Sequence, residues 1–466
     1  MSASPTSVGS GGGSDRVGVT SPVASPVEPV PDPDHEARVV RAVAHAHTDI
    51  PFYAKRGRAP IDPSAPLAEV LRATPLLTKT DVRATLPKQW VPASIDVKAA
   101  LASGDIELVE TSGSTSERLR ILWDKGWWIR QEDRAMRTNP IVARAHAGAF
   151  GPYKETILTT PVCGLATCHV GDLPLAERVD EHRLFLNMRP DPTFWRPDDM
   201  DRMLDELAAH PTIGLETDPM YFATLARYAA SKGRTIDVKG FAQLTYAFTT
   251  RGHVRGIRKA YGGPLLQLYG ASEVGVLFME GGDGLLHHAP FTTHVELLPC
   301  KVATPGAKNV ALVVVTTLDR VAQPLVRFVV GDLVEVAPAG PRTYTTVSPI
   351  VGVEGRVQDS VLRPDGAIVT CAAIDRALGA CDVAVFQVNQ REPASVDVDV
   401  VPEPGSEARV VEAARAALAP LLDGMTLNVR TATAIAAEPS GKFRVARREF
   451  PLDLARSFEG CEGVRL

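Results

Sequence analysis

Cysteine is scarce in this chain, with six residues in 466. So few cysteines cannot supply the disulfide framework of a small secreted protein, so we expect a reducing compartment, the cytoplasm by default. No uninterrupted apolar stretch reaches about 18 residues, so we expect no contact with a membrane. The chain also lacks a strong excess of one charge, since the formal net charge is −5. Without a broad basic field, nucleic acid is excluded as the principal ligand, and small molecules are favoured.

The first 33 residues contain no aromatic side chain and few long apolar ones. They cannot bury enough surface to offset the entropy of ordering, so we predict a disordered tail over residues 1–33. Its Gly9–Gly13 cluster is not a nucleotide loop, because no strand pattern precedes it and no helix pattern follows. The remaining chain contributes most of the 45% hydrophobic residues, enough for a large core in two to four compact units.

Apolar periodicity in the remaining chain alternates between helix and strand patterns. Helices are expected at 35–47, after the cap-like Leu77–Asp81, and at 127–147, 200–209, 221–231 and 254–261. Strands are expected at 106–110, 243–248 and 265–269, followed by short β runs at 310–317, 325–330 and 333–337. Strands alternating with helices at this spacing indicate a mostly parallel sheet.

The last part of the chain predicts a separate α+β unit. Strands at 383–389, 395–401 and 427–433 surround a helix at 407–422. The fold class is therefore α/β, with a large N-terminal α/β domain of mixed sheets over residues 34–356. A small α+β C-terminal domain over residues 357–466 follows, with a hinge between Arg356 and Ser360.

A loop rich in hydroxyl groups follows the first expected strand directly. Its backbone N–H groups and hydroxyls are suited to surround phosphate oxygens, although an ordinary polar turn is the other interpretation. It is not a Walker loop, because no Gly-Lys-Ser/Thr follows. The five residues of this loop are Thr111, Ser112, Gly113, Ser114 and Thr115.

A second group of candidate residues ends the strand at 265–269. Its aromatic side chain is suited to pack on a purine, its glycine would let a ligand approach, its serine can donate to phosphate, and its carboxylate can hold Mg²⁺. A strand-to-helix turn with a glutamate near a helix N-terminus is an equally good interpretation. These residues are Tyr269, Gly270, Ala271, Ser272 and Glu273.

Three further charged residues complete the candidate site. Asp332 can accept hydrogen bonds from both ribose hydroxyls, although alone it fits a turn equally well. Arg356 suits ribose or phosphate, although a surface salt bridge is the commoner fate of an arginine. Lys442 lies in a turn-rich segment with a second cation, and most such lysines are simply solvated.

Taken together and in this order, these residues resemble the adenylate-forming superfamily of acyl-coenzyme A ligases, and more closely its phenylacetate-coenzyme A ligase branch. The likeness covers roughly residues 35 to 450. Framework segments at 50–53, 76–79, 316–320, 324–328 and 441–444 contribute to it.

The resemblance implies an enzyme whose small C-terminal domain rotates between two half reactions. Residues 111–115 would hold the ATP phosphates, and 269–272 would line the adenine and α-phosphate site. Glu273 would bind Mg²⁺, and Asp332 and Arg356 would bind ribose. Asp359 would be the hinge, and Lys442 would bridge carboxylate and α-phosphate when the domains close.

The sequence departs from the branch at several places. Ser116-Glu117 follows the phosphate loop where glycine is usual, which adds a carboxylate near the phosphates. Tyr246, Ala247 and Phe248 stand where the branch has Gly-Ala-Glu, so we expect an altered acyl pocket, with Phe248 as an aromatic wall. His287 is a candidate near the acyl group, and a structural histidine pair is the other interpretation.

We expect a ligase that uses ATP and Mg²⁺ to convert a small-molecule carboxylic acid, aromatic by resemblance, to an acyl-AMP. The acyl group then passes to coenzyme A, and an amine or a separate carrier protein is the alternative acceptor. A non-catalytic ATP-binding regulatory module is the alternative function of a different class. The oligomeric state stays open, a homodimer included. Cys163, Cys168 and His169 do not predict a zinc site, because a fourth ligand is missing.

Overall fold

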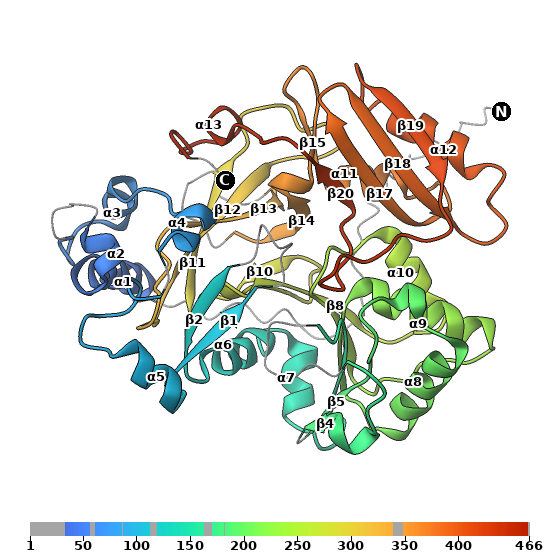
Figure 1. The fold of residues 1–466 in the computed structure, drawn as a ribbon, viewed down its shortest axis with the longest axis horizontal. Helices are drawn as coiled ribbons and strands as arrows, with labels where there is room; N and C mark the ends of the chain where they lie inside the picture. The colour runs from blue at the N-terminus through green and yellow to red at the C-terminus, as the bar shows by residue number, and fades with distance from the viewer. Residues whose placement is uncertain are drawn as a thin grey trace, which may run out of the picture.

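The computed structural model describes residues 33–55, 61–85, 87–111, 119–162, 170–180, 182–338 and 348–464, and Figure 1 shows their arrangement. Three sequence predictions fall largely outside these residues. They are the disordered tail, the phosphate loop from Ser112 to Thr115 with Ser116 and Glu117 after it, and the segment with Cys163, Cys168 and His169.

A mixed sheet of twelve strands forms the centre of the described part of the chain, in the order β11-β12-β13-β14-β10-β9-β8-β7-β6-β3-β5-β4. The strands are β3 (Glu155–Leu158), β4 (Val179–Asp180), β5 (Arg183–Phe185), β6 (Gly214–Thr217), β7 (Phe241–Leu244), β8 (Leu265–Ala271), β9 (Gly275–Glu280), β10 (Leu286–His288), β11 (Thr293–Pro299), β12 (Val310–Thr317), β13 (Phe328–Val336) and β14 (Ile350–Arg356).

The two halves of this sheet differ in strand direction. Strands β5, β3, β6, β7 and β8 are parallel to one another, whereas the pairs from β8 to β11 are antiparallel. A parallel pair needs a long crossover, which the helices between most of these strands supply, while short turns connect β8 to β9 and β9 to β10. The predicted mostly parallel sheet is therefore correct only for one half. Strand β12 is buried along its whole length, which explains its continuous apolar sequence.

Helices cover both faces of the parallel half, and alternate strand positions show which face each one covers. Leu215, Ala242 and Leu265 share a core with three helices, whereas Phe241 and Leu266 share another core with two helices on the opposite face (Figure 1). On the first face lie α8 (Pro197–Ala209), α9 (Pro219–Ser231) and α10 (Arg251–Arg258), and on the second α6 (Trp127–Met136) and α7 (Pro140–His146).

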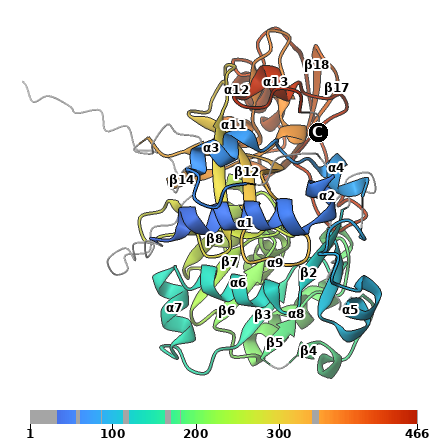
Figure 2. The same cartoon turned by 90° about the vertical axis from the view of Figure 1, so that its left-hand side faces the viewer.

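The N-terminal elements pack against the antiparallel half through the largest apolar core, and Figure 2 shows α1 crossing in front of it. The predicted cap is confirmed, because the Thr78 side chain accepts from the backbone N–H of Asp81 and Asp81 returns the bond. These elements are α1 (His35–Asp49), α2 (Pro51–Ala54), α3 (Leu67–Ala73), α4 (Lys79–Arg83), α5 (Val97–Ser103), β1 (Ile106–Glu110) and β2 (Arg120–Asp124).

The C-terminal part forms its own four-stranded sheet, in the order β19-β18-β17-β20, with a separate apolar core. It lies at the upper right of Figure 1. Its elements are η3 (Val357–Asp359), β15 (Val361–Leu362), β16 (Ile368–Val369), α11 (Cys371–Leu378), β17 (Val383–Glu392), β18 (Ser395–Pro402), α12 (Val410–Leu418), β19 (Thr426–Thr431) and β20 (Ala446–Arg448). Short elements elsewhere are η1 (Leu175–Glu177), η2 (Pro192–Phe194) and α13 (Leu454–Ser457).

Three predicted elements are wrong in extent. The helix expected at 127–147 is two helices, because Asn139 caps a new helix that starts at Pro140. The runs at 325–330 and 333–337 are parts of one strand, β13. Gly331, which lies between them, adopts a φ of 94° without interrupting the strand. Strand β7 ends at Leu244, and Tyr246 has a φ of 69°, so Tyr246, Ala247 and Phe248 lie beyond the strand.

The last described residues return to the large sheet. Phe458 and Cys461 are buried in a core with side chains of β12 and β13. The backbone N–H of Lys301 donates to Ser457 O at 2.8 Å, and that of Glu459 donates to Pro299 O at 3.0 Å. The C-terminal sheet is thus tied to the large sheet at both of its ends. Among the described helices, none is both long and apolar enough to cross a membrane.

Candidate active site

Tyr269, Asp332 and Arg356 form a hydrogen-bonded group on three strands. The hydroxyl of Tyr269 on β8 donates to Asp332 Oδ2 on β13 at 2.8 Å. Arg356 Nε, directly opposite on β14, lies 3.3 Å from Asp332 Oδ1. Burial and the charge of Asp332 raise the pKa of the Tyr269 phenol, which therefore remains a donor. Asp332 is buried but the Arg356 side chain is 49% exposed, so a ligand can reach the arginine.

Glu273 is buried beside a lysine that the sequence analysis did not select. Lys79 Nζ, in the first turn of α4, lies 3.4 Å from Glu273 Oε1. Burial alone would raise the pKa of the Glu273 carboxyl, but Lys79 and then Arg356 lower it, so Glu273 is ionised at neutral pH. Arg320 Nη1 donates to the carbonyl of Glu273 at 2.8 Å, and Trp123 Nε1 donates to that of Ser272 at 3.0 Å.

This environment fits Mg²⁺ better than a metal with several protein ligands. The described residues contain no group of three or more His, Cys, Asp or Glu side chains that could hold a metal ion. Mg²⁺ commonly uses one or two carboxylates together with phosphate oxygens and waters, which a single ionised glutamate satisfies.

Gly270 has a structural reason to be glycine. A Cβ atom at this position would lie 2.6 Å from the carbonyl oxygen of Gly275 and 2.9 Å from the Cα of Val276. The close approach is therefore to the protein's own β9 strand. Ala271 is the last residue of β8, and Ser272 begins the turn that contains Glu273.

Thr111 is the described part of the expected phosphate loop. Its N–H donates to Leu119 O at 2.8 Å, and its Oγ1 accepts from Leu119 N at 2.9 Å. These two bonds close the connection between the antiparallel strands β1 and β2. Thr111 therefore lies where β1 ends, and Trp123 of β2 links this strand pair to Ser272.

The loop that carries Lys442 contacts the large domain at two carbonyl groups. Tyr221 Oη of α9 donates to Gly441 O at 2.8 Å, and Thr160 Oγ1 donates to Ser440 O at 3.1 Å. Gly441 has a φ of 77°, and a Cβ atom here would lie 2.0 Å from Thr160 Oγ1. Only glycine fits this contact.

Asp218 marks the place that Lys442 faces. This carboxyl is completely buried between β6 and α9, and its Oδ1 accepts from the N–H of Met220 at 2.8 Å. Burial raises the pKa of Asp218 to about 6, and the positive charge of Lys442 opposes that rise. The lysine is therefore close to the carboxyl end of β6, in the parallel half of the large sheet.

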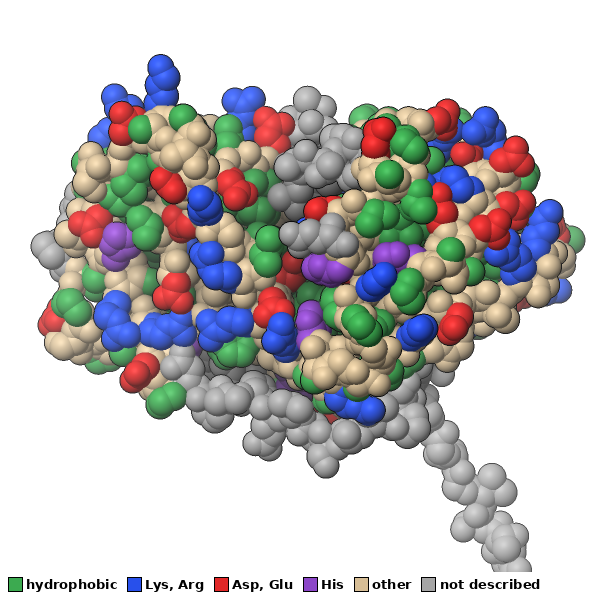
Figure 3. Space-filling model, turned by 90° about the horizontal axis from the view of Figure 1, so that it is seen from below, with side chains coloured by type: hydrophobic (Ala, Val, Ile, Leu, Met, Phe, Trp, Pro, Cys, Tyr) green, Lys and Arg blue, Asp and Glu red, His purple; other side chains and the backbone are tan. Residues whose placement is uncertain are grey.

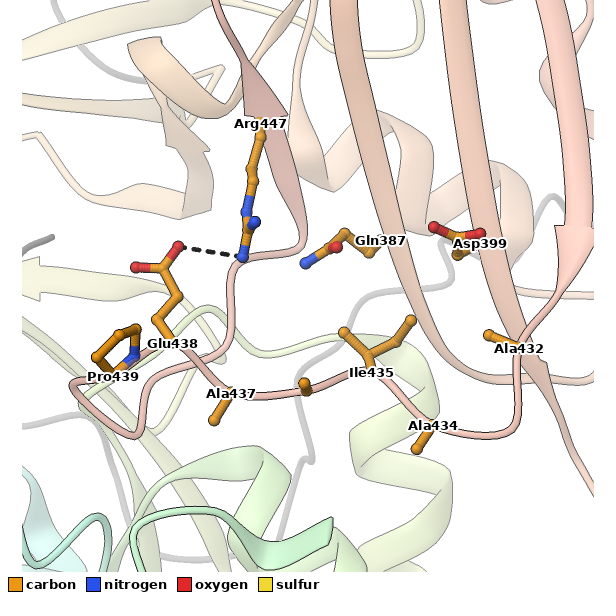
Figure 4. A pocket seen from close by; sticks show the side chains of 10 residues that line it. Gln387, Asp399, Ala432, Ala434, Ile435, Ala437, Glu438, Pro439 and Arg447 are labelled. Atoms are coloured by element: carbon orange, nitrogen blue, oxygen red, sulfur yellow. Dashed lines mark ion pairs between the residues drawn. The ribbon is translucent and has the colours of Figure 1, made fainter.

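Contacts around Asp359 and Glu438 hold the small domain's connecting segments. Arg444 Nε donates to Asp359 Oδ1 at 3.0 Å, which joins η3 to the lysine loop. A pocket of about 640 Å³ lies between β17, β18 and the loop before Lys442 (Figure 4). Across it, Arg447 Nη2 lies 3.2 Å from Glu438 Oε1.

The expected acyl-pocket residues lie in different surroundings. Phe248 packs against the apolar core of the small domain. Burial, and then the negative charge of Glu216 on β6, raise the pKa of the Tyr246 phenol. His287 Nε2 of β10 lies 3.0 Å from Asp283 Oδ1, in the turn between β9 and β10. Ala247 lies between Tyr246 and Phe248 in the same segment.

Sequence reasoning missed Lys79, Thr160, Tyr221, Asp218 and Trp123. Only Lys79 had a local signal, because it lies inside the capping segment that the resemblance includes as framework. The others reach the site through packing between distant segments, which no short motif encodes.

The amino-acid sequence matches no protein-family model and no curated protein. The fold does match solved structures. A crystal structure of 2-hydroxyisobutyryl-CoA ligase in the postadenylation state with R3-HIB-AMP has a TM-score of 0.62 at 17% identity, covering 91% of each chain. The same ligase with 2-HIB-AMP in that state also gives 0.62, at 16% identity and the same coverage. Its open conformation with 2-HIB-AMP and CoA gives 0.51 at 17% identity, covering 91% of this chain and 93% of that one.

The chain therefore has the fold of an adenylate-forming ligase, with a large mixed-sheet part and a small α+β part, as the resemblance predicted. At this level of identity the likeness concerns the fold.

Proposed function

We propose that this protein activates a carboxylic acid with ATP to an acyl-adenylate and then transfers the acyl group to coenzyme A. The observation that carries the proposal is the contact of the Lys442 loop with Thr160 and Tyr221, which brings a cation of the small domain to the large sheet. Such a cation supplies charge stabilisation only when the two domains are closed.

The nucleotide would bind across β8, β13 and β14, near the carboxyl ends of β8 and β14. Asp332 would accept from the ribose hydroxyls, with Arg356 as its charged neighbour, and the Tyr269 ring would face the purine together with Gly270 and Ala271. Ser272 and the loop from Thr111 to Thr115 would bind phosphate oxygens. The buried, ionised Glu273 would hold Mg²⁺, which supplies charge neutralisation at the phosphates when bound.

In the first half reaction, a carboxylate oxygen of the acid attacks the α-phosphorus of ATP. The bond from the α-phosphorus to the bridging oxygen breaks, and the electron pair leaves with pyrophosphate. Lys442 would stabilise the charge on the α-phosphoryl oxygens. In the second, the coenzyme A thiolate attacks the acyl carbon, the C–O bond to phosphate breaks, and AMP leaves. Coenzyme A is proposed because the similar solved structures are those of a CoA ligase.

Two domains, residues 34–356 and 357–466 with the hinge at Asp359, would give the rotation between these steps. We also propose that the acid is aromatic and that Tyr246 contacts it. Ala247, Phe248 and His287 are the other candidate residues of the acyl site. The four described cysteines are free, which supports a reducing compartment such as the cytoplasm.

Acid-dependent exchange of labelled pyrophosphate into ATP tests the first step, screened over aromatic and aliphatic acids with and without Mg²⁺. AMP release in the presence of coenzyme A, simple amines or neither identifies the acceptor. Exchange with at least one acid supports the proposal. Tight ATP binding without exchange for any acid contradicts it and favours a regulatory module.

A further inference from the structure

Three glutamates gather on the face of the parallel half that α6 and α7 cover. Glu155 is on β3, Glu216 is on β6, and Glu132 is on α6; we call them the acidic cluster. The strand register places Glu155 opposite Gly214, so that Glu155 and Glu216 point to the same face. Phe241, on that same face of β7, packs with α6 and α7, which confirms the side.

The cluster contains more carboxyl groups than cationic groups. The cation that faces it is Arg183 of β5, and Nε of this arginine is buried without a hydrogen-bond partner. Trp128 of α6 lies close to Glu132, and Tyr246 lies close to Glu216. Tyr153 Oη lies 3.4 Å from Glu155 Oε1, and its ring stacks on His146 at 4.0 Å between centroids. Burial and mutual repulsion raise the pKa of Glu155 to about 8.

Gln243 is an independent observation at the same place. It lies on β7 directly opposite Glu216, on the same face, and is only 1% exposed. Neither its Nε2 nor its Oε1 has a hydrogen-bond partner. A buried amide with both ends unsatisfied costs free energy unless something polar completes it. The three glutamates are each partly exposed, so the cluster is not sealed from solvent.

The cluster also lies at a defined distance from the lysine. Glu216 precedes Asp218 by two residues, and Asp218 is the carboxyl that faces Lys442. Two residues of a strand span roughly 6.6 Å. A molecule whose carboxylate lay near Lys442 would thus reach the cluster with a second group several bonds away.

We propose that the acidic cluster binds an ammonium group on the acid substrate, with Glu216 as the principal partner and Gln243 as a second acceptor. This inference rests on the proposed function for the identity of the ligand as a substrate acid. An ammonium group supplies three N–H donors, which matches an excess of carboxylate and amide oxygens. A bound ammonium group also offsets the repulsion between the carboxylates, which otherwise keeps protons on the cluster. Binding at neutral pH therefore releases protons.

Matched acids test the proposal directly. para-Aminomethylbenzoate is compared with para-ethylbenzoate, and ε-aminocaproate with heptanoate, since each pair differs only in exchanging an ammonium group for methyl. Binding is measured by calorimetry without ATP, in two buffers of different ionisation enthalpy, and exchange of pyrophosphate is measured separately. We expect the ammonium member to bind about ten- to a hundredfold more tightly and to release protons.

Glu216→Gln keeps the shape of the side chain and removes its charge, so the preference for the ammonium member should fall about tenfold or more. Glu155→Gln is the second variant, in case the first one fails to fold. The control is Glu412→Gln, at an exposed position of α12 in the C-terminal part, which should leave the preference unchanged.

The outcomes separate the two proposals. Equal binding of both members, or a changed melting temperature with an unchanged preference in Glu216→Gln, overturns the ammonium site and makes the cluster structural. Exchange with neutral acids alone leaves the proposed function standing and overturns this inference. Binding of the ammonium member that depends on Glu216, without exchange for any acid, supports this inference and contradicts the proposed function.

Discussion

The hydroxyl of Tyr269 donates a 2.8 Å hydrogen bond to Asp332 Oδ2, and this bond joins two strands from different halves of the large sheet. It occupies one acceptor position of a carboxylate and orients the other oxygen toward Arg356, 3.3 Å away. Because the phenol remains a donor, this bond holds the Asp332 side chain in one orientation before any ligand arrives. Pre-orientation of this kind reduces the entropy that a ribose would lose on binding.

Replacing Asp332 with Ala should weaken ATP binding by about ten- to a hundredfold, because hydrogen bonds to a charged group contribute roughly 1.5–3 kcal/mol each. Calorimetry with ATP and with a dideoxyribose analogue measures the effect. The analogue should lose much of the affinity in the wild type and little more in the variant. Asp423→Ala, at an exposed aspartate, is the control. Simple addition of the two losses would show that Asp332 does not contact ribose.

Lys442→Ala should lower adenylate formation by about a hundredfold or more, since a charge aimed at the developing α-phosphoryl charge is removed. Transfer from a supplied acyl-AMP to coenzyme A should be largely retained. Pyrophosphate exchange measures the first reaction and thioester formation the second. The matched control is Lys98→Ala, at an exposed lysine. An equal loss in both reactions in a folded variant contradicts a role confined to adenylation.

Gly441→Ala tests whether the lysine loop must contact the large domain. The new Cβ atom would collide with Thr160 Oγ1, so the loop is displaced and adenylation should fall by more than about tenfold. Gly405→Ala is a matched control, because Gly405 has a similar φ of 85° but nothing within 4 Å of the added atom. Comparable activity of the two variants would mean that only backbone strain matters.

Asp218 predicts a pH dependence of stability. Its folded-state pKa of about 6 lies above the ordinary value of 3.8, so the folded state favours the protonated form. The protonated Asp218 carboxyl therefore stabilises the folded state fully below pH 3.8, and this stabilisation is lost as the pH rises through 6. Above that range the free energy of unfolding is lower by about 3 kcal/mol.

Asp218→Asn should remove this loss while keeping the cap of α9, because asparagine caps a helix equally well. Denaturant unfolding at several pH values measures the effect: the variant should be more stable than the wild type at pH 8 and similar to it below pH 4. Asp198→Asn, at an exposed position of α8, is the control. A constant difference at all pH values would rule out titration of Asp218 as the cause.

Phe458→Ala should destabilise the protein by about 3–5 kcal/mol, because a fully buried ring between the C-terminal segment and the large sheet leaves a cavity. Phe194→Ala, at a residue that is 74% exposed, should have little effect. Thermal unfolding measures both variants. A small effect at Phe458 would mean that the C-terminal segment contributes little to the folded state.

The charges on the surface agree with the composition. Figure 3 shows Lys and Arg interspersed with Asp and Glu on the face that it presents, without a broad field of one sign. The net charge of −5 describes the chain as a whole. That its charges are spread evenly could be predicted from the sequence, because Lys and Arg alternate with Asp and Glu along it.

The sequence by itself determined the elements whose cause is local. Helix α1, the Thr78 capping box, strand β1 and strand β12 were predicted with correct or nearly correct bounds, because periodicity and caps act over a few residues. The sequence also selected Tyr269, Asp332 and Arg356, since each follows or lies in a β run. That Asp332 and Arg356 lie opposite each other, and that the Tyr269 hydroxyl donates to Asp332, needed the strand register.

Only the tertiary structure decided which distant segments meet. Lys79 reaches Glu273, Thr160 reaches Ser440, and the three glutamates of the acidic cluster come from three elements. The extents of β7 and β13 were misjudged, because Tyr246 adopts a positive φ beyond the end of β7, whereas Gly331 adopts a positive φ without ending β13. Local patterns cannot encode such contacts, because their free energy depends on the order of strands in the sheet and on which face each helix covers.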